Sequence, residues 1–306
     1  MNIRVIEKEI LSSDGEHALK GKVYIPEGSP AGLFHVVHGM CEYIGRYDGF
    51  MRELANEGFI VFGYDHLGHG ETAREGELGF IAHKDGWKRL VDDVYVFGKA
   101  IRAEYGEDLP FVLMGHSMGS FIVRIAAAEY GMFDKLIVMG TGGPNPAAGI
   151  GLAVIKAIKA LKGEKHISKT VYSLAFGSYN KKFASENDVF SWLSKDRSVR
   201  ERYAADKFCN YKFTSSAMGD LVTLNKLSNT KEINSKLVCK KPILLVSGGD
   251  DPVGENGAGV KKVCAELKSL GADVEMKIYD NCRHEILNDT CRGEVIKDII
   301  DFVKQK

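Results

Sequence analysis

The sequence predicts an α/β fold with a mainly parallel sheet and a helical segment inserted into it. Short, continuous apolar runs typical of buried parallel strands alternate along the chain with longer amphipathic runs typical of helices. The alternation breaks once: roughly 100 residues separate two successive strands, although a parallel crossover needs only about a dozen. An inserted unit accounts for this length better than a single loop does. We therefore expect one domain from residues 1–144 and 233–306, with residues 145–232 inserted as a helical cap.

The elements before the insertion are delimited by glycines and turn sequences. The first two strands are joined by Ser12-Ser-Asp-Gly15, which is typical of a turn. Amphipathic helices are expected over residues 46–57, where Gly58 ends the first, and over residues 87–105. The predicted strands of this part cover residues 3–10, 17–25, 32–38, 59–64, 111–114 and 135–139.

The same alternation returns after the insertion. Strands are expected over residues 242–247 and 274–279, and helices over residues 257–270 and 294–303. Within the insertion one helix stands out, because apolar residues recur at positions 150, 154, 155, 158 and 161.

Charge and composition exclude several classes of function. The chain has 41 Lys and Arg residues and 41 Asp and Glu residues, so no excess of basic charge favours nucleic acid. Residues 1–10 lack the apolar core of a signal peptide, and no apolar run reaches the ~18 residues that a membrane span needs. No C-x-x-C pair is present, so we expect six free thiols and a reducing cytoplasm. The cysteines are Cys41, Cys209, Cys239, Cys264, Cys282 and Cys291.

A candidate nucleophile lies between the apolar run 111–114 and a helical run that ends near residue 130. The connecting sequence is Gly115-His-Ser-Met-Gly119. A serine on a sharp strand-to-helix turn projects its hydroxyl clear of the sheet, and flanking glycines let strand and helix backbones approach closely. The start of the helix adds unpaired N–H groups and a positive dipole end. We therefore predict Ser117 as the nucleophile.

A carboxylate and a histidine follow the two strands after the insertion. Functional groups of a parallel sheet gather outside the carboxyl ends of its strands. Asp250 and Asp251 come after the run 242–247, and His284 comes after the run 274–279. The order serine, aspartate, histidine suits a catalytic triad. We prefer Asp251 as the acid, with Asp250 as the alternative, and His284 as the base.

The oxyanion site is expected to use two backbone N–H groups. One belongs to the residue after the nucleophile, and the other to the loop after an early strand. In this chain these residues are Met118 and Met40.

Six short motifs occur along the predicted catalytic domain. They are His38-Gly39, Gly45-Arg-Tyr47, Asp65-His-Leu-Gly-His-Gly70, Gly115-His-Ser-Met-Gly119, Asp251-Pro-Val-Gly254 and Arg283-His-Glu285. Together they resemble the serine hydrolases of the α/β-hydrolase superfamily, most closely the monoacylglycerol lipase and lysophospholipase group, also called serine aminopeptidase S33. The chain departs from the group's usual pattern at Met40-Cys-Glu-Tyr43, which lacks a second glycine and a final histidine, and at Leu67, where arginine is usual.

The resemblance implies an α/β-hydrolase fold and carboxylester hydrolysis through an acyl-enzyme. The expected substrate is a small ester or single-chain lipid, such as a monoacylglycerol or a lysophospholipid, and no cofactor or metal is expected. Ser117, His284 and Asp251 would form the triad, and the N–H groups of Met40 and Met118 would bind the oxyanion.

Other functions stay open. A general small-ester esterase has the same fold, and so does a non-catalytic ligand receptor. A peptidase that releases N-terminal residues would need a cap carboxylate to bind a free amine. The candidates are Glu164, Glu186 and Glu201.

Two further motifs carry little weight. Gly149-Ile-Gly151 is followed by Val154 where a dinucleotide-binding motif has its third glycine, and no strand precedes it. His66 and His69 form an H-x-x-H pair on a glycine-rich loop, which is weak evidence for a metal.

The cap allows two interpretations of its apolar residues. They line an acyl pocket, or they form the cap's own core. Residues 150–161 likewise either pack over the active site or make transient contact with a membrane surface through their apolar face. The apolar residues in question are Phe176, Phe183, Trp192, Leu193 and Phe208.

Overall fold

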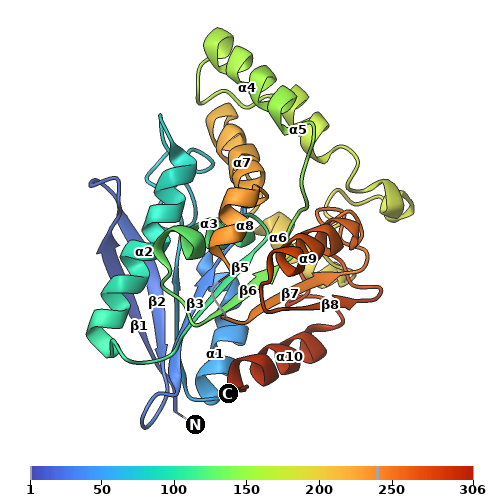
Figure 1. Cartoon of the computed structure of the whole chain (residues 1–306). Helices are drawn as coiled ribbons and strands as arrows, with labels where there is room; N and C mark the ends of the chain where they lie inside the picture. Colours follow the sequence, from blue (N-terminus) through green and yellow to red (C-terminus); the bar gives the residue numbers. More distant parts are fainter. Residues whose placement is uncertain (1, 239–240, 306) are drawn as a thin grey trace.

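One eight-stranded sheet organises the chain (Figure 1). The computed structural model describes residues 2–238 and 241–305, so Cys239 lies outside the described residues. The strand order is β1-β2-β4-β3-β5-β6-β7-β8, with β1 and β2 antiparallel and the strands from β4 onward parallel. The predicted α/β fold with a mainly parallel sheet is confirmed. The strands are β1 (Arg4–Leu11), β2 (Ala18–Ile25), β3 (Gly32–Val37), β4 (Phe59–Tyr64), β5 (Phe111–His116), β6 (Lys135–Met139), β7 (Ile243–Gly248) and β8 (Val274–Tyr279).

Helices cover both faces of the sheet and bury its central strands. Every residue of β3, β4, β5 and β7 is buried, which explains their uninterrupted apolar sequences. On one face, a hydrophobic core joins the sheet to α2 (Gly86–Tyr105), α3 (Met118–Tyr130) and α9 (Ala258–Leu270). On the other face, a second core joins it to α1 (Asp48–Asn56), which the short helix η1 (Ile44–Tyr47) precedes, and to α10 (Arg292–Lys304). Figure 1 shows these two layers above and below the sheet.

All the remaining helices lie between β6 and β7, where the insertion is predicted. Helices α7 and α8 pack on α3, whereas α4 and α5 extend away from the sheet at the top of Figure 1. The predicted end of the insertion, residue 232, falls inside α8. These helices are α4 (Ala148–Lys162), α5 (Lys169–Phe176), η2 (Lys181–Glu186), α6 (Arg197–Ala205), α7 (Ser215–Ser228) and α8 (Lys231–Lys236).

Among the described residues, no helix has both the length and the apolar composition that crossing a membrane requires.

The prediction of free thiols is wrong for two cysteines, because Cys282 and Cys291 form a disulfide. The loop between β8 and α10, residues 280–291 (the His loop), folds back on itself and brings their Cα atoms to 6.5 Å, within the range that a disulfide spans. Sequence spacing gave no sign of this fold-back, and the argument for a reducing compartment does not hold for this pair. Free, buried thiols are found at Cys41, Cys209 and Cys264.

Candidate active site

Ser117 lies at the tight turn between β5 and α3, residues 115–119 (the elbow). Its backbone has φ 54° and ψ −119°, a conformation that non-glycine residues rarely adopt and that surrounding contacts must hold in place. The Ser117 N–H donates to the Met139 carbonyl at 2.9 Å, which ties the elbow to the end of β6. The sequence therefore folds locally as predicted, with the serine between the last residue of a strand and the first of a helix.

The two glycines of the elbow are required by close backbone packing. A Cβ atom on Gly115 would lie 2.2 Å from the carbonyl oxygen of Gly119, and a Cβ on Gly119 would lie 2.2 Å from that of Val37. Both distances are far below any real contact, so β3, β5 and α3 can meet here only through glycine.

His284 and Asp251 form a buried pair beside the elbow. His284 Nδ1 lies 2.9 Å from Asp251 Oδ2, and since a carboxylate only accepts, Nδ1 carries the hydrogen of this bond. The other carboxylate oxygen of Asp251 accepts from the Val253 N–H at 2.9 Å, which fixes its orientation. The His284 ring lies 4.8 Å, centroid to centroid, from that of His116, the residue before Ser117. The structure thus places the predicted base and acid together, beside His116, the residue that precedes the predicted nucleophile.

Asp250, the alternative acid, has different surroundings. Its carboxylate pairs with Lys182 Nζ at 2.5 Å, and its N–H donates to the Cys282 carbonyl at 2.9 Å. The geometry therefore favours Asp251 over Asp250 as the partner of His284.

The loop that carries Met40, residues 38–43 (the oxyanion loop), lies against the elbow. A Cβ on Gly39 would come within 3.0 Å of the Ser117 Cβ. Met118 is the first residue of α3. The structure thus places Gly39, the residue before Met40, close to Ser117, and Met118 directly after Ser117 at the start of α3.

Buried charged residues connect the three loops of this site. Glu42 Oε1 accepts from the Gly39 N–H at 2.6 Å and from the Tyr47 hydroxyl at 2.9 Å, and it lies 3.0 Å from His116 Nδ1. Arg46 donates to both oxygens of Glu285 at 2.7 Å, and its Nη1 lies 3.2 Å from Glu42. The oxyanion loop, the elbow and the His loop are therefore held in register by one network.

The network also sets the charges of its members. Burial alone would raise the pKa of Glu42, but His116 and Arg46 hold that pKa well below its usual range. Burial alone would lower the pKa of His116, but the Glu42 carboxylate raises it. Sequence analysis did not identify Glu42, Arg46 or Glu285 as members of the site. Arg46 and Glu285 belong to motifs that carry the family resemblance, whereas Glu42 lies in the stretch that departs from the family pattern.

The H-x-x-H pair is buried with His38 rather than arranged around an ion. His66 Nε2 lies 3.1 Å from the His38 carbonyl, and His69 Nδ1 lies 2.9 Å from the Leu67 carbonyl. Burial lowers the pKa of His69 to about 3. In the part of the chain that the structure describes, no group of three or more His, Cys, Asp and Glu side chains is placed to hold a metal ion.

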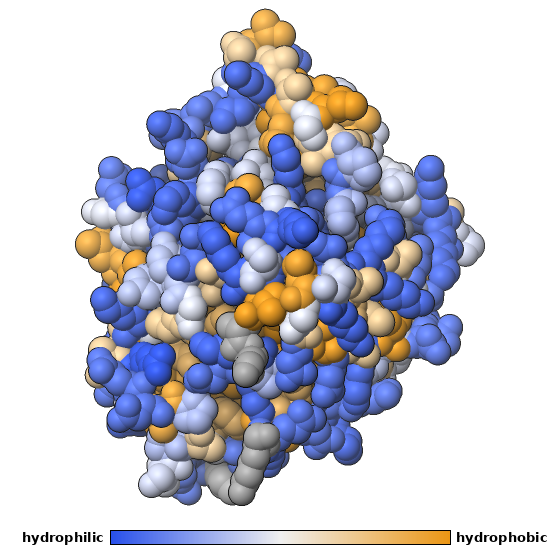
Figure 2. Space-filling model, viewed as in Figure 1, coloured by the Kyte–Doolittle hydropathy of each residue, from blue (hydrophilic) through white to orange (hydrophobic). Residues whose placement is uncertain are grey.

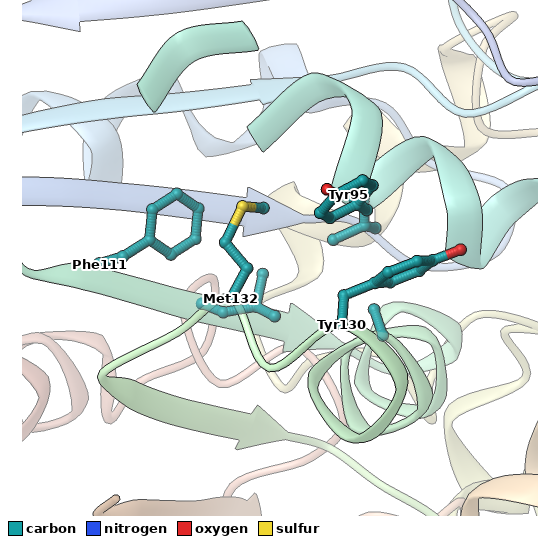
Figure 3. A pocket seen from close by; sticks show the side chains of 7 residues that line it. Tyr95, Phe111, Tyr130 and Met132 are labelled. Carbon is teal, nitrogen blue, oxygen red and sulfur yellow. The ribbon is translucent and has the colours of Figure 1, made fainter. Parts of the chain in front are cut away.

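A small apolar cavity of about 10 Å³ lies at the amino end of β5, at the opposite end of the strand from Ser117 (Figure 3). Its volume admits about one water molecule, and the surface that faces it is apolar. It is lined by α2, β5 and α3 with Tyr95, Phe111, Tyr130 and Met132 among the side chains (Figure 3).

Comparison with known proteins gives a consistent result. The model of a hydrolase family described as serine aminopeptidase S33 matches residues 28–291. A monoacylglycerol lipase from Mycolicibacterium smegmatis is 25% identical over 307 residues, covering 96% of this chain and 98% of the relative. Human monoglyceride lipase is 27% identical over 280 residues, covering 90% of this chain and 82% of the relative. The solved structure of a highly thermostable carboxyl esterase from Bacillus coagulans, in complex with glycerol, has a TM-score of 0.92 and 31% identity, and the match covers 99% of this chain and 98% of that one.

Proposed function

The chain belongs to the serine aminopeptidase S33 family of α/β-hydrolases and is a serine ester hydrolase, and from this premise we propose that it cleaves single-chain lipid esters, such as monoacylglycerols or lysophospholipids. The observation that carries the proposal is the buried His284–Asp251 pair beside the Ser117 elbow. The names of the relatives support the substrate class, because two are lipases of monoacylglycerols.

In the proposed mechanism Ser117 Oγ attacks the ester carbonyl carbon while His284 Nε2 takes the hydroxyl proton. The Asp251 carboxylate holds the imidazole in the required tautomer and stabilises the imidazolium. The tetrahedral intermediate then expels the alcohol, which receives the proton from His284 and leaves an acyl-serine. Water, deprotonated by His284, attacks the acyl carbon and releases the fatty acid and free Ser117.

The N–H groups of Met40 and Met118 are the proposed donors to the oxyanion. Loss of one such donor typically raises the barrier by about 3–4 kcal/mol. The hydrogen bond from Gly39 to Glu42 supports this role, because it fixes the backbone immediately before Met40. Glu42 thereby acts as a positioning residue for the oxyanion loop.

We assign residues 145–232 as a cap over this site. The cap touches the catalytic loops directly: Trp192 packs on His284, with 5.1 Å between the ring centroids, and the Tyr203 hydroxyl donates to the Cys41 carbonyl at 2.9 Å. Phe183 is buried under the Arg283 guanidinium, and Leu193 is buried in a small cluster with Tyr203 and Cys209. Phe176 and Phe208 are half-buried and available to an acyl chain, whereas the half-buried Trp192 lies on His284.

The outer cap helices support transient contact with a lipid surface. Helix α4 exposes Ile150 and Leu161, and α5 exposes Leu174. Figure 2 shows hydrophobic residues, in orange, gathered at the top of the molecule, where Figure 1 places α4. Exposed lysines lie beside them at Lys156 and Lys162. An apolar face flanked by basic residues suits the interface of a membrane, where it would meet substrates dissolved in lipid.

The peptidase alternative has less support. The three cap carboxylates considered for binding a free amine all pair with cations of the chain. Glu186 pairs with Arg283 and Arg200, Glu164 with Lys159, and Glu201 with Arg197.

A labelling experiment tests the nucleophile. Ser117→Ala should abolish reaction with a fluorophosphonate probe and hydrolysis of 4-nitrophenyl esters, while its melting temperature stays close to that of the parent. Ser269→Ala, which removes an exposed serine of α9, is the matched control and should label normally. Persistent labelling of Ser117→Ala would refute the assignment.

A hydrolysis panel tests the substrate class. It should contain short nitrophenyl esters, monoacylglycerols, lysophospholipids and aminoacyl amides. We expect the highest kcat/KM on the single-chain lipid esters, and activity confined to the amides would favour the peptidase instead.

A further inference from the structure

The cap reaches the catalytic domain at two separate loops through two separate segments. Residues 181–196 (the cap segment), which span η2 and the loop after it, lie on the His loop. Residues 203–211 lie on the oxyanion loop, where Cys41 Sγ donates to the Tyr211 carbonyl at 3.4 Å. The two sides of the site are therefore covered independently.

Arg283, the residue before His284, attaches the cap segment. Its buried guanidinium donates to the Ser191 carbonyl at 2.6 Å and to the Ser194 carbonyl at 3.3 Å, and it forms an ion pair with Glu186. It also lies over the Phe183 ring, 3.9 Å from the centroid. Hydrogen bonds lower the pKa of Glu186 to about 2, and the largest contribution comes from Arg283, with a further one from Arg200. The Glu186 carboxylate is therefore ionised at neutral pH.

Backbone bonds continue the attachment past the catalytic histidine. The Glu285 N–H donates to the Leu193 carbonyl at 2.8 Å, and the His284 N–H donates to the Trp192 carbonyl at 3.4 Å. The cap segment and the His loop thus run side by side, and a shift of one displaces the other.

This arrangement places the Trp192 indole on the His284 imidazole. Their centroids are 5.1 Å apart and their planes 37° apart, and the Tyr179 ring lies 5.1 Å from Trp192 as further support. Asn180 Oδ1 accepts from the backbone N–H of Trp192 at 3.0 Å. Trp192 is half-buried, so part of the indole stays accessible.

We propose that Trp192 forms a wall of the leaving-group site and selects the alcohol of the ester, with Arg283 as the residue that positions it. The inference rests on the proposed function, since it takes His284 as the general acid that protonates the leaving alcohol. The alcohol oxygen must come within hydrogen-bond reach of His284 Nε2, so the alcohol lies beside the imidazole and its neighbour Trp192. The large indole favours compact alcohols such as glycerol over bulky ones such as glycerophosphocholine.

Two ester series separate this role from a role in acyl binding. The first keeps a decanoyl group and varies the alcohol from ethanol to glycerol to glycerophosphocholine. The second keeps 4-nitrophenol and varies the acyl chain from acetyl to palmitoyl. Trp192→Leu should raise kcat/KM for the glycerophosphocholine ester relative to the glycerol ester by about tenfold, the usual scale of steric selection in a pocket, and leave the acyl-chain preference as it was.

Glu186→Gln tests the positioning role of the Arg283 attachment. It should shift the alcohol preference in the same direction as Trp192→Leu, by a smaller factor, and leave the acyl preference unchanged. Val189→Ser, on the same segment and 72% exposed, should change neither series. Phe208→Leu, in the segment on the oxyanion loop, should leave the ranking of alcohols unchanged.

The outcomes are distinguishable. If Trp192→Leu changes the acyl series instead of the alcohol series, or changes neither, the wall assignment is wrong. If Trp192→Leu fails to give a cooperative melt, Trp192→Phe replaces it and is judged by the same two series. If Ser117→Ala still turns over these esters, the proposed mechanism fails, and this inference fails with it.

Discussion

Asp250 and Asp251 are adjacent in the chain, yet they have opposite environments. Asp251 is fully buried and accepts hydrogen bonds on both oxygens, from His284 and from the Val253 N–H. Asp250 is partly exposed and pairs with Lys182 of the cap. A carboxylate can orient an imidazole only if its own position is fixed, so the two residues have different expected roles.

Replacement of Asp251 by Asn should lower kcat by about 10³- to 10⁴-fold, because an amide cannot hold His284 in the tautomer that accepts the serine proton. Steady-state hydrolysis of a 4-nitrophenyl ester measures the effect. Asp250→Asn is the matched control and should keep kcat within a few-fold of the parent. Equal losses in the two variants would contradict the assignment of Asp251.

At the scale of elements, a buried carboxylate joins the cap helix α7 to the start of α2. Asp220 Oδ1 accepts from the Trp87 N–H at 2.9 Å, in the first turn of α2, while Oδ2 has no partner among the described residues. Burial, assisted by nearby Asp85 and Glu164, raises the pKa of Asp220 from 3.8 to about 7. The ionised form is therefore the less stable one in the folded protein.

This raised pKa predicts that Asp220→Asn stabilises the folded protein by an amount that depends on pH. The contribution of Asp220 to the free energy of unfolding falls as the pH rises from about 4 to about 7, because this carboxyl in the folded state retains a proton that it has lost in the unfolded state. Asn keeps the oxygen that accepts from Trp87 and does not titrate. The variant should melt about 2–4 °C above the parent at pH 8, and the difference should shrink toward pH 4.

Differential scanning calorimetry at several pH values measures this effect. Asp108→Asn, an exposed position in the turn before β5, is the control and should show no such trend. A melting difference for Asp220→Asn that does not vary with pH would contradict the prediction.

The elements that the sequence predicted well are those with one simple environment. Continuous apolar runs marked the central strands, alternating runs marked β1, β2 and β8, and β4, β6 and β8 have the predicted bounds. Inside the cap only α4 was anticipated. Helix α7 buries Ser215, Ser216 and Asp220 together with its apolar residues, so no clean apolar face marks it, and α8 is too short for a periodic pattern.

The residues of the candidate site likewise fall into those that the sequence predicted and those that it did not. Ser117, Asp251 and His284 could be proposed from sequence because each directly follows a predicted strand of a parallel sheet. The Glu42–His116 contact and the Cys282–Cys291 bond join residues through tertiary folding. Local patterns report burial and periodicity, and they carry no information on which polar residues meet.

At the scale of the molecule, the most exposed apolar side chains gather on the outer cap. Ile150 and Leu161 on α4 are 72% and 84% exposed, and they lie at the far end of the molecule from the chain termini (Figure 1). With net charge zero, the protein has no overall attraction to an anionic surface, so apolar contact must supply the binding energy.

The double replacement Ile150→Ser/Leu161→Ser should weaken adsorption to lipid vesicles at least tenfold, since each buried apolar side chain contributes about 1.5–3 kcal/mol. Vesicle co-sedimentation measures binding, and hydrolysis of dissolved 4-nitrophenyl acetate should stay unchanged. Leu11→Ser, which removes an apolar side chain 60% exposed on β1, is the control and should bind like the parent. Unchanged adsorption of the double variant would remove α4 from the proposed contact.

The paired glycines of the elbow restrict how this enzyme can evolve. Every amino acid that one nucleotide change can substitute for glycine carries a Cβ, and at Gly115 or Gly119 that atom would collide with backbone. The obstructing atoms belong to the backbone, so no replacement of a side chain removes them. Variation that survives selection must therefore accumulate around the elbow, in the cap and its loops, while the turn that holds Ser117 stays fixed.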